Sequence, residues 1–198
     1  MANYTAVNGV LLALESFFNS RMPSELSEGP VNARVALLGS ADITKPISGN
    51  ALGLYLHRIS IDPHGRSRHF PAQGTQKGEA PAGELPLNLH FLLIAAASSA
   101  TIEANLMAWA MVELANESKL DISHMAETDQ GWTQREVLTI TPEDMSTEDL
   151  MRIWDVFKTQ YTSTVPYCIK TVRLRLKQPQ TLGPPVRTRV FPTGIAEA

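Results

Sequence analysis

The sequence contains a single cysteine, Cys168, in 198 residues. One thiol excludes an internal disulfide and any metal site built from several cysteines. Cys168 falls in a stretch with the composition of a strand, so we expect a small buried hydrophobic side chain and not a nucleophile. Long apolar runs are also missing. No run is longer than that of residues 91–97, which has the length of a strand core, well short of the roughly 20 residues that a membrane-spanning helix needs.

Common catalytic motifs are absent as well. There is no Gly-rich phosphate loop, no Gly-x-Ser-x-Gly elbow and no Cys/His pairing. The first residues carry no positive region ahead of a continuous apolar block, so we expect no secretory signal and a cytoplasmic protein. With 43% hydrophobic and 19% charged residues, the composition is that of an ordinary globular domain. No cofactor, metal or catalytic residue is expected.

Charge is unevenly distributed along the chain. The net charge is −3, yet residues 165–198 hold six basic residues and one acid, which leaves +5 there and −8 on the remainder. Such polarity suits docking of a basic surface on an acidic neighbour. It also suits nucleic acid, but the interleaved aromatic residues of a nucleic-acid surface are missing.

Hydrophobic periodicity predicts a single mixed β-sheet flanked by about three helices, an α/β (α+β) fold. One apolar face recurs at helical spacing in each predicted helix, and apolar residues alternate in the strands. The predicted helices span residues 5–21, a second segment capped by Ser99 or Thr101 that ends at about residue 117, and residues 146–157. The predicted strands span residues 33–38, 51–61, 87–94, 136–141 and 161–176, and the second has apolar residues on both faces, as a central strand does.

The last predicted helix has the clearest local signals. Ser146 stands at the N-cap, and Glu148 and Asp149 complement the helix dipole in the first turn. Four apolar residues then recur at i, i+3, i+4 and i+7, which indicates a core-facing stripe. They are Leu150, Ile153, Trp154 and Phe157.

Glycine, proline and polar residues mark the connections. Residues 62–85 have no apolar period and are predicted to form a long loop, and a second polar stretch covers residues 118–134. After residue 176 the sequence has too much proline for a helix and too little apolar density for a core. We therefore expect a domain of residues 1–176 and an extended, basic C-terminal arm of residues 177–198.

Four blocks in this order resemble the cap, or tail-terminator, family of extracellular contractile injection systems, which are phage-tail-like particles. The blocks are the helix that opens near Tyr4, Leu52-Gly-Leu-Tyr-Leu-His-Arg-Ile, Leu85-Pro-Leu-Asn-Leu-His-Phe-Leu-Leu, and Leu150-x-x-Ile-Trp-x-x-Phe with the strand of residues 161–176. The resemblance implies a tail-terminator-like fold and a noncatalytic structural protein. It also implies a homohexameric ring at the distal end of the tail, which ends the inner tube and anchors the last sheath layer, with the sheath and inner-tube proteins as partners.

Two segments depart from the pattern of that family. Residues 62–69 lack its usual aromatic or Arg-Asn pair. Residues 95–99, Ala-Ala-Ala-Ser-Ser, replace larger side chains with small ones, which lets another backbone approach closely.

We expect the basic segment to bind an acidic surface of a neighbouring subunit or of the sheath protein. The arm also has apolar residues that would hold a partner, and it could add an edge strand to one. The residues predicted to bind a partner are Arg173, Arg175, Lys177, Arg187, Arg189 and Phe191.

Two other functions stay open from the residues alone. A small histidine-dependent hydrolase or nucleotide-binding enzyme would place the 62–85 loop over His57 and His90, whereas a nucleic-acid-associated adaptor would use the basic arm. A metal site on His57, His64, His69 and His90 is disfavoured, because these histidines lack the spacing of metal ligands.

Overall fold

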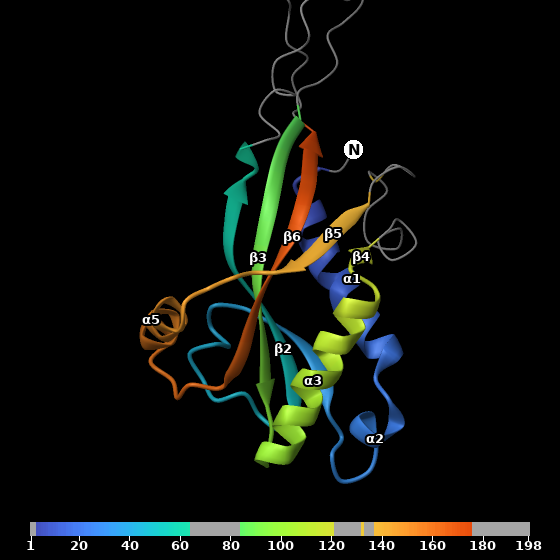
Figure 1. Ribbon diagram of the computed structural model, residues 1–198, viewed down its shortest axis with the longest axis vertical. Helices are drawn as coiled ribbons and strands as arrows, with labels where there is room; N and C mark the ends of the chain where they lie inside the picture. The colour runs from blue at the N-terminus through green and yellow to red at the C-terminus, as the bar shows by residue number, and fades with distance from the viewer. Residues whose placement is uncertain (1–2, 64–83, 121–131, 133–136, 176–198) are drawn as a thin grey trace, which may run out of the picture.

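The computed structural model describes residues 3–63, 84–120, 132 and 137–175. Within these residues, six strands form one mixed sheet in the order β1-β2-β3-β6-β5-β4 (Figure 1). Strand β1 is parallel to β2, and every other neighbouring pair is antiparallel. The strands are β1 (Arg34–Leu38), β2 (Ala51–Ile61), β3 (Glu84–Ala96), β4 (Lys119–Leu120), β5 (Leu138–Pro142) and β6 (Ser163–Arg175).

The helices cover both faces of this sheet. Helices α1 (Ala6–Arg21) and α3 (Ala100–Asn116) lie together on one face, and α5 (Thr147–Phe157) lies on the other (Figure 1). A four-residue helix, α2 (Ser24–Ser27), follows α1. The predicted mixed sheet with three main helices is confirmed. No helix in the described ranges is long and apolar enough to cross a membrane.

The larger core lies between the sheet and the helices α1 and α3. Helix α1 buries Phe17 and Phe18, and the Phe18 ring meets the Trp109 ring of α3 edge to face, with centroids 5.7 Å apart. The sheet contributes alternate residues of β3, among them Leu89 and Phe91. The amphipathic spacing of α1 therefore aims one side of the helix at the sheet.

A smaller core lies under α5 on the opposite face. Three of the four stripe residues, Leu150, Trp154 and Phe157, are buried there against Leu92 and Ile94 of β3, and Ile153 is partly buried. The predicted cap is also confirmed, because the Ser146 hydroxyl oxygen accepts a hydrogen bond from the backbone N–H of Asp149 at 3.1 Å.

Two predicted boundaries are wrong. Glu84 and Leu85, assigned to the loop, begin β3, where they pair with Arg175 and Leu174 of β6. The polar stretch 118–134 contains β4, in which the fully buried Leu120 pairs with Leu138. In both places pairing to a distant strand decides the structure, and local composition does not report it. The rest of the 62–85 loop beyond residue 63 and the arm lie outside the described residues.

Candidate functional site

The predicted basic face begins on β6. Arg173 lies with its Nε 3.9 Å from Oε2 of Glu84 on β3, and its side chain is 38% exposed. Its guanidinium is thus paired within the chain but still open to solvent on one side. The side chain of Arg175, and Lys177, Arg187, Arg189 and Phe191, lie outside the described part, so their role in partner binding stays a prediction.

His57 and His90 do come together, as neighbours on β2 and β3 with ring centroids 6.2 Å apart. His64 and His69 lie outside the described residues. Among the described residues, no group of three or more His, Cys, Asp or Glu side chains has the arrangement to hold a metal ion. The arrangement around His90 is instead a hydrogen-bonded cluster.

His90 is 6% exposed and both of its ring nitrogens have partners. Nδ1 lies 2.8 Å from Oε2 of Glu143, and Nε2 lies 2.8 Å from the hydroxyl oxygen of Ser60. A carboxylate only accepts hydrogen bonds, so Nδ1 donates to Glu143, and in the neutral ring Nε2 then accepts from the Ser60 hydroxyl. Arg58 donates to Oε1 of Glu143 at 3.1 Å and also lies 3.2 Å from Nδ1 of His90.

This cluster, Arg58, Ser60, His90 and Glu143, links several strands. Two members come from β2 and one from β3, and Glu143 directly follows β5. The backbone N–H of Glu143 also donates to the carbonyl of Pro166 in β6 at 3.0 Å. The side-chain hydrogen bonds therefore tie together strands that come from distant parts of the sequence.

His57 lies at an irregularity in β2. The pairing of β2 with β3 shifts between Leu56 and Arg58, so the alternation of side chains is interrupted at His57. Its Nε2 is buried and has no hydrogen-bond partner in the part of the chain that the structure describes. Burial lowers the pKa of His57 below 6.5, and Glu143 partly opposes that effect.

The outer half of β2 is an open edge. Strand β1 pairs only with residues Ala51 to Tyr55, and beyond Tyr55 the described residues provide no strand on that side (Figure 1). Ile59 and Ile61 there are 49% and 52% exposed. The predicted central position of β2 is confirmed up to Tyr55, where β1 and β3 flank it, and does not hold beyond Tyr55 because β1 stops at Leu38. An open edge with exposed apolar residues is a typical site for association with another chain.

A family model described as the Pvc16 N-terminal domain matches residues 9–188. Two solved structures have the same fold. One is the sheath/tube terminator of an extracellular contractile injection system, PVC, in the extended state, with a TM-score of 0.57 and 15% identity. The other is the anti-feeding prophage cap, the AFP tube terminating cap, with a TM-score of 0.54 and 14% identity.

The two solved chains are longer than this one. The match to the first covers 100% of this chain and 66% of that chain. The match to the second covers 94% of this chain and 59% of that chain. No curated protein matches the sequence.

The lowered pKa of His57 predicts that the free energy of unfolding decreases as the pH falls below about 6.5. The unfolded chain protonates His57 near that pH, whereas the folded chain does so only at lower pH, so acid favours unfolding. In the His57→Gln variant, the decrease in the urea midpoint between pH 7.5 and pH 5.5 should be smaller than in the wild type. Equal decreases in the two proteins would contradict this assignment.

Proposed function

The chain belongs to the Pvc16 N-terminal domain family, and we propose that it is a structural cap that terminates the tube and sheath of an extracellular contractile injection system. The observation that carries this proposal is the family match over residues 9–188, together with a fold shared with two terminating caps of such particles. The protein acts by binding other proteins and has no catalytic role.

The cap works as a homohexameric ring at the distal end of the tail, in contact with the last layers of the inner-tube and sheath proteins. It assembles in the cytoplasm as part of the particle. Ring closure requires each subunit to present different surfaces to its two neighbours. Two features support such an arrangement: the opposite charges of residues 165–198 and of the remainder, and a sheet with different helices on its two faces.

Residues 1–176 form the tail-terminator-like domain, and residues 177–198 form an arm that binds a partner. We assign partner binding to the basic residues Arg173, Arg175, Lys177, Arg187 and Arg189, with Phe191 as an apolar contact. The half-exposed Arg173 supports this assignment, because it leaves a cationic side chain at the point where the arm begins. The acidic partner is a neighbouring subunit or the sheath protein.

One observation favours the hydrolase alternative. Ser60, His90 and Glu143 follow the hydrogen-bond order of a Ser–His–acid triad. The pairing of Arg58 with Glu143 favours the structural role instead, because it neutralises the carboxylate and adds a further link between strands. Hydrolysis of p-nitrophenyl acetate by the wild type at a rate lost in Ser60→Ala would support the enzyme. Equal rates in both would contradict it.

Removal of the gene should give particles with tubes of uncontrolled length or with sheaths that detach, since nothing would end the tube or hold the last sheath layer. Negative-stain electron microscopy of purified particles measures tail length and sheath integrity. Restoring the wild-type gene on a plasmid is the control and should return a single length. Normal particles in the absence of the protein would contradict the cap function.

Truncation after Leu176 should abolish attachment to the ring or sheath while the domain still folds, because the truncation leaves every described element intact. Circular dichroism of the purified variant verifies folding, and electron microscopy of particles from cells that carry only the truncated gene reports assembly. As a control, the full-length variant Val156→Ala, which changes an exposed residue of α5, should assemble into particles normally. Normal ring formation and sheath attachment by the truncated chain would remove the arm from the proposal.

A further inference from the structure

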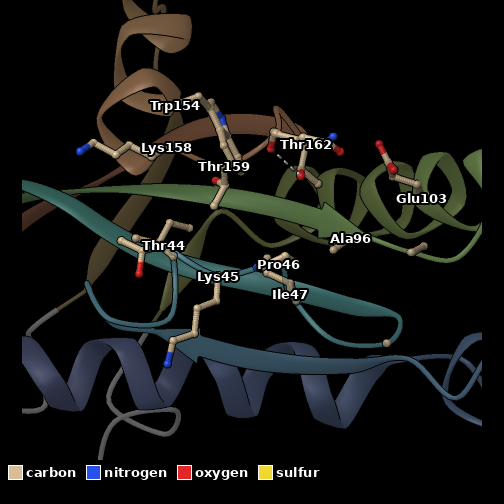
Figure 2. A pocket seen from close by; sticks show the side chains of 14 residues that line it. Thr44, Lys45, Pro46, Ile47, Ala96, Glu103, Trp154, Lys158, Thr159 and Thr162 are labelled. Carbon is tan, nitrogen blue, oxygen red and sulfur yellow. Dashed lines mark hydrogen bonds between the residues drawn. The ribbon is translucent and has the colours of Figure 1, made fainter.

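A cavity of about 580 Å³ lies between α5 and the loop that joins β1 to β2 (Figure 2). Three of its lining residues are small: Gly49 in the loop, and Ala96 and Ala97 at the end of β3. Small side chains leave room for the backbone of another segment. A volume of this size is within the range of pockets that hold ligands or several residues of a peptide.

Two buried polar atoms in the residues that line this cavity have no hydrogen-bond partner in the described ranges of the chain. They are Nε1 of Trp154, a residue that is 5% exposed, and the hydroxyl oxygen of Thr159. Figure 2 shows both side chains on the α5 side of the cavity, close to one another. The indole N–H only donates hydrogen bonds, so the missing partner is an acceptor such as a main-chain carbonyl. A buried donor without a partner is costly, and a bound ligand would relieve that cost.

The charged residues limit what the ligand can be. Lys45 and Lys158 line the cavity, but Figure 2 shows their side chains extending away from the other lining residues. Glu103, from the first turn of α3, lies at the other end of the cavity from Trp154. The lining therefore has, at one end, two buried hydrogen-bonding groups without a partner among the described residues and, at the other, a carboxylate for a basic side chain.

We propose that this cavity binds the arm of a second copy of the chain, within residues 178–192; this inference rests on the proposed function and names the partner surface of the arm. The segment contains four prolines and the basic residues Arg187 and Arg189. Proline-rich segments favour an extended conformation whose carbonyls are free to accept hydrogen bonds. Recognition of such segments commonly uses an aromatic-lined groove. Trp154 and Thr159 bind carbonyl oxygens, and Glu103 pairs with an arginine.

The position of the cavity favours a second copy over the chain's own arm. Thr162 lines the cavity just before β6 begins, whereas the arm follows Arg175 at the opposite end of that strand. The 13 residues of β6 span roughly 40 Å at about 3.3 Å per residue. An arm that bound its own cavity would have to reverse direction and run back along the sheet. A neighbouring copy presents its cavity head to tail without that reversal.

Cysteine cross-linking between differently tagged full-length chains tests whether the cavity binds the arm of a second copy of the chain. One chain carries Lys158→Cys at the rim of the cavity and the other carries Val186→Cys in the arm; the native Cys168 is buried. Mild oxidation of the mixture should give a disulfide-linked dimer with both tags. The matched control carries Val112→Cys in place of Lys158→Cys. Val112 is an exposed residue of α3 that does not line the cavity, so the yield of disulfide-linked dimer should be at least tenfold lower.

Equal yields from the two mixtures would overturn the proposal. So would a bond that forms only within one chain when Lys158→Cys and Val186→Cys are combined in the same molecule.

A synthetic peptide of residues 178–192 tests the chemistry of the site. Its binding to the full-length protein, measured by fluorescence anisotropy, should weaken roughly fivefold in Trp154→Phe and again in Thr159→Val, since each removes one hydrogen bond. Thr159→Val should leave the melting temperature unchanged or higher, because in the free protein it removes a buried hydroxyl that has no partner within the described ranges. If Thr159 only stabilised the fold, its substitution would lower the melting temperature.

The control variant Trp132→Phe removes another buried indole N–H that has no partner among the described residues, in the core on the opposite face, and should bind the peptide as the wild type does. Wild-type affinity in both Trp154→Phe and Thr159→Val, or tighter binding of a peptide with glutamate at positions 187 and 189, would overturn the proposal. The proposed cap function is judged separately by particle length. If the peptide binds but particles without the gene are normal, the cap function alone is contradicted. If those particles are defective in tail length or sheath attachment but the peptide does not bind, this site alone is contradicted.

Discussion

Burial of β3 on both faces is the constraint on which the rest of this structure depends. Leu89 and Phe91 lie in the larger core, and Leu92 and Ile94 lie in the smaller one, all fully buried. Each such side chain contributes about 1.5–3 kcal/mol when removed from water. The strand therefore needs cover on two sides, which α1 and α3 provide on one face and α5 on the other. It also needs a strand at each edge, and β2 and β6 fill these positions.

Sequence reasoning was most successful where a local signal determines the structure. The apolar spacing of residues 5–21 and the cap at Ser146 predicted α1 and α5 within a residue or two. The extent of β2 was also predicted, but the open edge along its outer half was not, because that edge depends on where the partner strand β1 ends. Leu120 gives a similar lesson: one apolar residue in a polar stretch shows no period, and only its pairing with Leu138 makes it a strand.

In the candidate sites, too, the sequence identified single residues but not the contacts that the fold creates between them. The sequence singled out His57 and His90, and the structure places them side by side. The sequence could not predict that Glu143, which follows β5, forms a hydrogen bond with His90. Trp154 was correctly assigned to a core, yet no local sequence pattern reports that its indole nitrogen has no hydrogen-bond partner among the described residues. The small residues after position 95 were the one sequence signal for the cavity, and two of them, Ala96 and Ala97, do line it.

The long pairing of β3 with β6 has a mechanical consequence. The two antiparallel strands are in register from Glu84 opposite Arg175 to Ala95 opposite Ser163, with one irregularity. Tension that pulls the strands past each other loads all of those hydrogen bonds at once, whereas tension across a strand end would open them one after another. Because the described part of β6 ends at Arg175, opposite Glu84 of β3, a force applied there along the strand is resisted in shear. The sheet would then transmit such a load into the domain without unzipping from its edge.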